Sequence, residues 1–122
     1  MQICIFGDTP FGEDLEAVVR NKSVAGHPVR VVQVRKVREV RGCHILFIAS
    51  SENSQPPQIA AELRGMSVLT VSDVPGFISQ GGMINFVLEN ERVRFEVNAK
   101  AAYEVRLRIS SKLLSLARNV IE

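Results

Sequence analysis

The chain has 122 residues, of which 46% are hydrophobic and 23% are charged, and its formal net charge is +2 at pH 7. This length suits a single domain, and the composition is that of an ordinary globular protein, which excludes wholesale disorder. The net charge is too small to argue for nucleic acid by itself, and no apolar run approaches the roughly 20 residues of a membrane-spanning helix.

The N-terminus does not read as a secretory signal peptide. Met1 is followed almost at once by the apolar run ICIF, without a basic leader or a small-residue cleavage site. This pattern predicts either a cytosolic protein or a fragment of a longer precursor.

The chain up to residue 72 alternates strand patterns with helix patterns. In chain order, strands are predicted over 2–6, 27–34, 44–50 and 67–72, and helices over 7–19 and 57–65. The charged stretch RKVREVRG between the second and third strands predicts a connector that can form a single helical turn. Strand–helix–strand units of this kind close right-handed onto a parallel sheet.

The stretch 83–97 predicts an antiparallel hairpin added to the edge or end of that sheet. A two-residue turn at Asn90 and Glu91 sets three apolar pairs on one face: Leu88 with Val93, Phe86 with Phe95, and Ile84 with Val97. A slip of one residue would turn every apolar side chain to the other face, so the register is well specified.

Two helices are predicted after the hairpin. The first covers 98–107 with Asn98 as its cap, and the second covers 108–122 with Ser110 or Ser111 as its cap. Ile109, Leu113, Leu116 and Val120 form an apolar stripe on the second helix. The predicted fold class is therefore α/β: a small three-layer domain, residues 1–122, with a largely parallel sheet, an added antiparallel β-hairpin and two C-terminal helices.

No pattern in the sequence is typical of catalysis or of a bound cofactor. His27 and His44 are too few and too distant to hold a metal ion, and no GxSxG elbow is present. The glycine turn GDTPFG matches neither the dinucleotide-binding motif nor the P-loop. We therefore expect a protein that is not an enzyme.

Two regions are candidates for binding. The first is a basic run offset locally only by Glu39: Arg35, Lys36, Arg38 and Arg41. It is interpreted first as a solvated edge, then as a surface for an acidic protein, and last as a nucleic-acid surface, because it lacks interleaved aromatic residues for base stacking. The second is the loop after the fourth strand together with the polar hairpin face, where a small polar ligand could bind at the carboxyl end of a parallel strand: Ser72, Asp73, Gly81, Gly82, Asn85, Arg94 and Glu96. The simpler interpretations of that second set are a connector rich in turn residues for the loop and a solvent-exposed polar face for the hairpin.

The two cysteines, Cys4 and Cys43, are too far apart for a CxxC redox motif or a zinc knuckle. Taken alone, they favour two free thiols in the core.

Several segments, in order and at the right spacing, resemble the YfiR family (YfiR/HmsC-like) of periplasmic proteins: CIFGDTPFGEDLE, GCHILFIASSE, SVLTVSDVPGFISQGGMINFVLENERVRFEVN and AAYEVRLRISSKLLSLARNV. The resemblance implies an exported, non-enzymatic repressor that binds the periplasmic part of a membrane-bound diguanylate cyclase of the YfiN type. Such binding lowers cyclic-di-GMP and biofilm formation, and the repressor can form a homodimer. A small-ligand-binding periplasmic sensor is the alternative function. The basic run and the leucine-rich last helix are the candidate docking surfaces.

The resemblance also implies a disulfide between the positions that match Cys4 and Cys43, which requires an oxidising compartment. Neighbouring strands are about 4.8 Å apart, a separation that a disulfide tolerates if the first strand lies beside the third. Family members usually carry a signal peptide, an amphipathic helix and a strand ahead of the segment matching ICIFGD, so a truncated form of an exported protein is expected.

Overall fold

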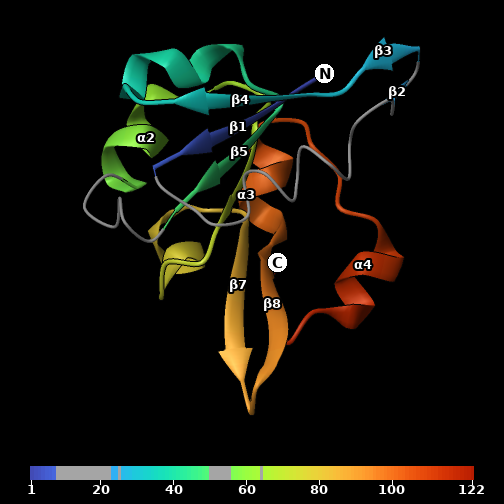
Figure 1. Ribbon diagram of the computed structural model, residues 1–122. Helices are drawn as coiled ribbons and strands as arrows, with labels where there is room; N and C mark the ends of the chain where they lie inside the picture. Colours follow the sequence, from blue (N-terminus) through green and yellow to red (C-terminus); the bar gives the residue numbers. More distant parts are fainter. Residues whose placement is uncertain (8–22, 25, 50–55, 64) are drawn as a thin grey trace.

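The computed structural model of the chain describes residues 1–7, 23–24, 26–49, 56–63 and 65–122. Within these residues, a mixed sheet of seven strands has the order β4-β1-β5-β6-β7-β8-β9 (Figure 1). Its strands are β1 (Gln2–Phe6), β4 (Arg30–Val34), β5 (Ile45–Ile48), β6 (Leu69–Ser72), β7 (Ile84–Glu89), β8 (Arg92–Asn98) and β9 (Asn119–Ile121). A separate antiparallel pair joins β2 (Ser23–Val24) to β3 (His27–Pro28).

The strands from β4 to β7 run parallel to one another. Numbered along the chain within the large sheet, these five strands have the order 2-1-3-4-5, which is one of the common orders of doubly wound α/β sheets. The predicted α/β class, with a largely parallel sheet and an added antiparallel hairpin, is confirmed.

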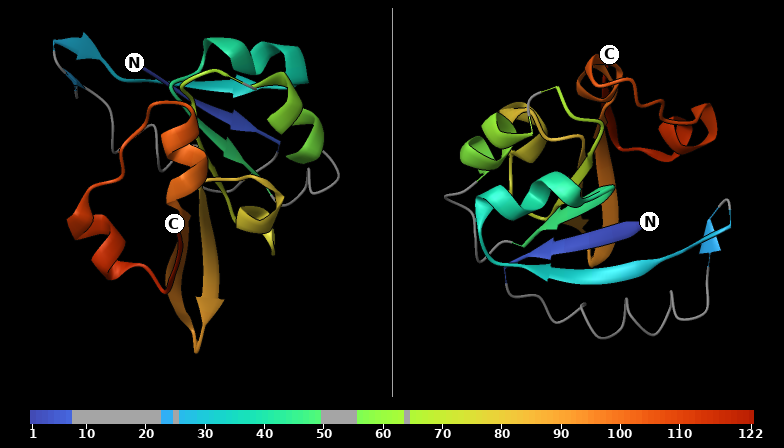
Figure 2. Two further views of the ribbon diagram at one scale, coloured as in Figure 1. Left: turned by 180° about the vertical axis from the view of Figure 1, so that it is seen from behind. Right: turned by 90° about the horizontal axis from the view of Figure 1, so that it is seen from above.

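The core forms two clusters because successive side chains of a strand point to opposite faces of the sheet. Leu46 and Ile48 of β5 belong to one cluster, with residues of the 3-10 helix η1 (Val37–Gly42), of α2 (Pro56–Glu62) and of the 3-10 helix η3 (Phe77–Gln80). Ile45 and Phe47 of the same strand pack against the other cluster, to which α3 (Ala99–Glu104) contributes Ala102. Figure 2 shows α2 and α3 standing apart around the sheet.

The hairpin of β7 and β8 has the predicted register. Ile84 lies opposite Val97, Phe86 opposite Phe95, and Leu88 opposite Val93. Its two turn residues have φ values of 51° and 66°, the left-handed conformation that a two-residue hairpin turn requires. The hairpin extends well beyond the parallel strands, and its turn forms the far tip of the molecule (Figure 1).

The first C-terminal helix begins where it was predicted. Asn98 caps α3, because its Oδ1 atom accepts a hydrogen bond from the backbone N–H of Ala101 at 3.0 Å. The side-chain amide of Asn98 also donates to the carbonyl of Ile78 at 3.1 Å. Asn98 therefore fixes both the end of β8 and the start of α3.

The prediction of a continuous helix over 108–122 is wrong. Helix α4 covers only Ser111–Leu116, with Ser110 as its cap, and β9 then pairs in parallel with the end of β8. The edge of β8 presents backbone groups that β9 satisfies, and a continued helix would leave those groups unpaired. The β-branched Val120 and Ile121 also favour the extended state.

The other predicted elements agree with the structure to within a few residues, and the connector at 35–42 contains η1. The predicted helix at 7–19 lies almost entirely outside the described residues.

Candidate functional site

A disulfide joins Cys4 of β1 to Cys43, the residue that follows η1, so the interpretation as two free thiols is wrong. The Cα atoms are 5.8 Å apart, which the adjacency of β1 and β5 makes possible. Cys4 is 1% exposed and Cys43 is 5% exposed. The bond therefore lies in the core. It joins β1 to the residues just before β5, as the family resemblance implied.

The basic run lies on η1 and on the residues that lead into it. All four cations are exposed: Arg35, Lys36, Arg38 and Arg41. The carboxylate of Glu39 accepts hydrogen bonds from the backbone N–H groups of Arg35 and Lys36, at 3.3 and 2.8 Å. Arg41 lies 3.7 Å from Glu62 of α2. The run thus forms a solvent-facing ridge, and its role in binding a partner stays a prediction.

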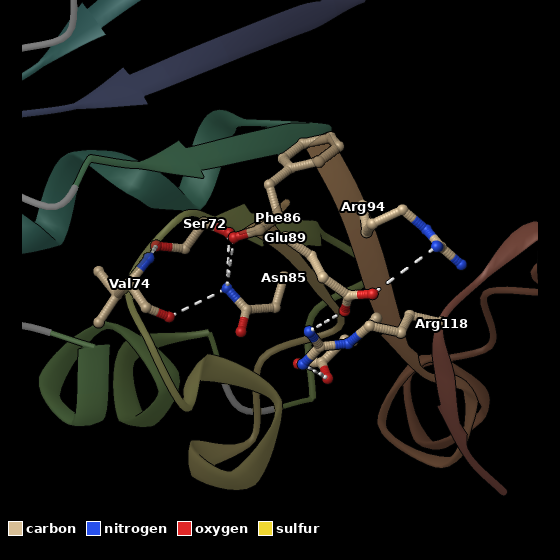
Figure 3. Close-up of polar contacts among 8 residues, drawn as sticks. Ser72, Val74, Asn85, Phe86, Glu89, Arg94 and Arg118 are labelled. Atoms are coloured by element: carbon tan, nitrogen blue, oxygen red, sulfur yellow. Dashed lines mark hydrogen bonds and ion pairs between the residues drawn. The ribbon is translucent and has the colours of Figure 1, made fainter. Parts of the chain in front are cut away.

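Ser72 and Asn85 are fully buried and hold the loop after β6 in place (Figure 3). The hydroxyl of Ser72 donates to the carbonyl of Ile48 at 2.6 Å and accepts from the N–H of Val74 at 3.0 Å. The side-chain amide of Asn85 donates to the carbonyls of Ser72 and Val74, at 2.9 and 3.0 Å. These bonds satisfy backbone groups that would otherwise be buried without partners, so both side chains act as loop anchors.

Of the seven residues predicted for a small polar ligand, Gly81 and Gly82 line the cavity described below, and the other five are not part of its lining. A polar ligand site at these seven residues stays a prediction. Asp73 is half-buried beside the loop anchors, and its Oδ1 atom, like that of Asn85, has no hydrogen-bond partner among the described residues.

Arg94 and Glu96 belong to an ion-pair cluster on the hairpin, of which Figure 3 labels Arg94, Glu89 and Arg118. The guanidinium of Arg118 bridges Glu89 and Glu96, with N–O distances of 2.7 and 2.8 Å, and Arg94 lies 4.0 Å from Glu89. Side-chain hydrogen bonds raise the pKa of Arg118 above its ordinary value. The bond to Glu89 contributes most and the bond to Glu96 contributes next. The cluster fastens the residue that precedes β9 to the hairpin.

A cavity of about 590 Å³ opens between the start of β6, the loop that contains Gly81 and Gly82 (the glycine loop), α2 and α3. Its lining is mainly apolar and includes Ile59, Leu63, Met66, Met83 and Val105. This volume is in the range of pockets that hold small organic molecules.

The apolar face of the hairpin is buried at its base and exposed at its tip. Ile84 and Val97 are 8% and 0% exposed, whereas Leu88 and Val93 are 75% and 70% exposed. Phe86, midway along the face, is 38% exposed. We call Phe86, Leu88 and Val93 the hairpin-tip patch. Contiguous exposed apolar side chains of this kind are typical of a surface that contacts another protein.

Neither histidine takes part in a catalytic arrangement within the described part of the chain. His27 is exposed, and His44 accepts a hydrogen bond at Nδ1 from the backbone N–H of Gln2 at 3.0 Å. In the same residues, no cluster of His, Cys, Asp or Glu is suited to a metal ion, and no helix has the length and apolarity to span a membrane.

Sequence reasoning missed three features. The bridging role of Arg118 could not be predicted, because the apolar pattern of its segment is helical. The cavity could not be predicted, because its walls come from parts of the chain that are distant in sequence. The exposure of the hairpin tip could be predicted only in part. The period-2 pattern identifies the apolar face of the hairpin, but it does not show which elements cover that face.

The model of the YfiR/HmsC-like family matches residues 1–118 of the chain. The fold is similar to a crystal structure of a conserved domain protein from Vibrio cholerae O1 biovar El Tor strain N16961, with a TM-score of 0.71 and 9% identity. The superposition covers 98% of this chain and 54% of that one, so this chain spans about half the length of that protein. Comparison with curated proteins found no match. Because the family model covers nearly the whole sequence, the chain belongs to the YfiR/HmsC-like family.

Proposed function

We propose that this protein is a non-enzymatic periplasmic repressor, which binds the periplasmic part of a membrane-bound diguanylate cyclase and thereby lowers cyclic-di-GMP and biofilm formation. Its family is known for periplasmic regulators of diguanylate cyclases and not for enzymes. The buried disulfide supports a periplasmic location, because such bonds persist in oxidising compartments.

The hairpin-tip patch is the observation that carries the proposal. A regulator that works by contact needs a surface whose burial favours association, and this patch exposes large apolar side chains on a well-paired hairpin. Covering Leu88 and Val93 completely would contribute about 2–4 kcal/mol before the cost of association is subtracted.

Repression by docking is a shift of population. The repressor favours the inactive state of the cyclase only by the difference between its affinities for the two states. The backbone that carries the patch is already paired between β7 and β8, which limits the conformational entropy lost when it binds.

The test is a binding assay between the purified protein and the periplasmic part of a membrane diguanylate cyclase encoded in the same genome. We expect Leu88→Ser with Val93→Ser to weaken binding about 10- to 100-fold, since a loss of about 1.4 kcal/mol is tenfold. The matched control is Tyr103→Ser on α3, which also removes an exposed apolar side chain, 64% exposed, and should change binding less than twofold.

Two outcomes would contradict the proposal at different levels. Unchanged binding of the double hairpin variant would show that the hairpin-tip patch is not the docking surface. The basic run at Arg35–Arg41 and α4 would then be the next candidates. No binding of the unmodified protein, with or without a reductant, would remove repression by docking altogether.

We further propose that residues 1–122 act as one domain and that two copies associate as a homodimer. Sedimentation equilibrium of the oxidised protein tests the second point, and a single species of monomer mass at all concentrations would exclude the dimer.

A further inference from the structure

The cavity between α2 and α3 has a structural origin in the sheet. Strand β7 pairs with β6 only from Val71 and Ile84 onward, so the residues before Val71 are not joined to the glycine loop by a backbone ladder. Gly81 contributes no side chain to the resulting space, and among the described residues no atom beyond those of Gly81 and its two chain neighbours lies within 4 Å of the position that its Cβ would occupy. In the described structure, the cavity volume is about 590 Å³.

The walls of the cavity are held in place, which keeps it from collapsing. Asn98 anchors the start of α3, and the hydroxyl of Ser67 donates to the carbonyl of Val105 at 2.5 Å just after that helix. On the other side, Ile59 of α2 is 1% exposed and is part of the core. A cavity with fixed walls is a preformed site, because the protein does not have to reorganise to admit a ligand.

The lining contains one buried hydroxyl that can still donate a hydrogen bond. Thr70 is 7% exposed, lines the cavity and accepts a hydrogen bond from the N–H of Met83 at 3.1 Å. A threonine hydroxyl can also donate one hydrogen bond, and no acceptor for that proton occurs among the described residues. A ligand oxygen placed beside Thr70 would accept this bond.

We propose that this cavity binds a small amphiphilic molecule: an apolar chain or ring that contacts Leu63, Met66 and Met83, with a hydroxyl or carbonyl oxygen that accepts from Thr70. The more polar end of such a molecule would face Gln80 and Glu104, the exposed polar residues of the lining. This site differs in place and in chemistry from a polar ligand site around Ser72 and Asp73.

The cavity is also connected to the hairpin. Helix α3 forms one wall and begins directly after the last residue of β8, and its Ala102 packs in the same cluster as Ile84 at the base of the hairpin. A ligand that fixes α3 would therefore also fix the base of the hairpin. This regulatory link rests on the proposed function, whereas binding in the cavity does not.

The experiment is a titration of the oxidised full chain with 1-octanol, followed by methyl signals in two-dimensional ¹H–¹³C NMR spectra. We expect saturable shifts of the Met66 and Met83 methyl groups. Thr70→Val should weaken binding about 2- to 10-fold, as expected for the loss of one hydrogen bond.

Two matched variants place the same new side chain inside and outside the cavity. Ala101→Leu, on the cavity wall, should weaken octanol binding at least tenfold, whereas Lys100→Leu, on the exposed surface of the same helix, should change it less than twofold. If Ala101→Leu does not fold, Ala61→Leu fills the cavity from the α2 side and carries the same expectation.

Three results would overturn the inference. The first is the absence of a saturable shift of the Met66 and Met83 methyl groups. The second is octanol binding by the filled variants that is as tight as that of the unmodified protein. The third is a set of shifts confined to Leu88 and Val93 at the hairpin tip. None of these results bears on cyclase binding, which the hairpin variants test separately.

Discussion

Removal of the Cys4–Cys43 disulfide should cost a large share of the stability of this protein. The two half-cystines are 39 positions apart, and cross-linking a loop of that size restricts the unfolded chain by about 4 kcal/mol in the chain-entropy model. Domains of this size are typically stable by about 5–15 kcal/mol, so the loss would be a substantial fraction of the total.

Urea titration followed by far-ultraviolet circular dichroism measures this loss, because the sequence contains no tryptophan for fluorescence. We expect the reduced protein and the double variant Cys4→Ala with Cys43→Ala to be destabilised by about 4 kcal/mol relative to the oxidised protein. The alanine variant should lose somewhat more, because both sulfur atoms lie in the core and their removal leaves a small cavity.

The alanine variant is also the control for the reductant, which should have no effect on it. Equal unfolding midpoints for the oxidised and reduced forms of the unmodified protein would refute the reasoning, because the cross-link would then not restrict the unfolded chain.

Four further substitutions test single contacts by the same titration or by hydrogen exchange. Gly82→Ala would place a Cβ atom 2.2 Å from the buried ring of Phe77, so stability should fall by about 1–3 kcal/mol, and an unchanged midpoint would show that the ring has room to move. Asn85→Ala removes the donor for two buried loop carbonyls and should cost about 2–4 kcal/mol; a loss below about 1 kcal/mol would mean that water replaces the amide. Glu91→Gly should raise stability by about 0.5–1 kcal/mol, because Glu91 has a φ of 66° and glycine adopts that conformation without a steric penalty; a decrease would contradict this account of the turn. Arg118→Gln should speed amide exchange in β9 at low salt and less so at high salt, and equal exchange rates would show that the ion pairs do not hold this strand.

The sequence alone was sufficient for features that depend on local periodicity and on single residues. The apolar alternation around Asn90 predicted the hairpin register, because a slip of one residue would reverse both faces. Asn98, and Ser110 or Ser111, predicted helix starts, because a side-chain oxygen at the cap position can accept a hydrogen bond from a backbone N–H group of the first turn; the structure places these bonds at Asn98 and Ser110. The runs of apolar residues likewise predicted the parallel strands and hence the α/β class.

The tertiary structure decided what depends on coverage and on neighbours distant in the sequence. Residues 119–121 follow a helical pattern of apolar positions, yet they form β9 because the edge of β8 offers them hydrogen bonds that no local pattern reveals. Asn85 lies on the polar side of the hairpin by its period, yet it is buried because the loop after β6 folds over it. Leu88 and Val93 lie on the apolar side and are exposed, since the hairpin reaches past the elements that cover its base. Periodicity states which side chains share a face, and only packing determines which parts of that face meet water.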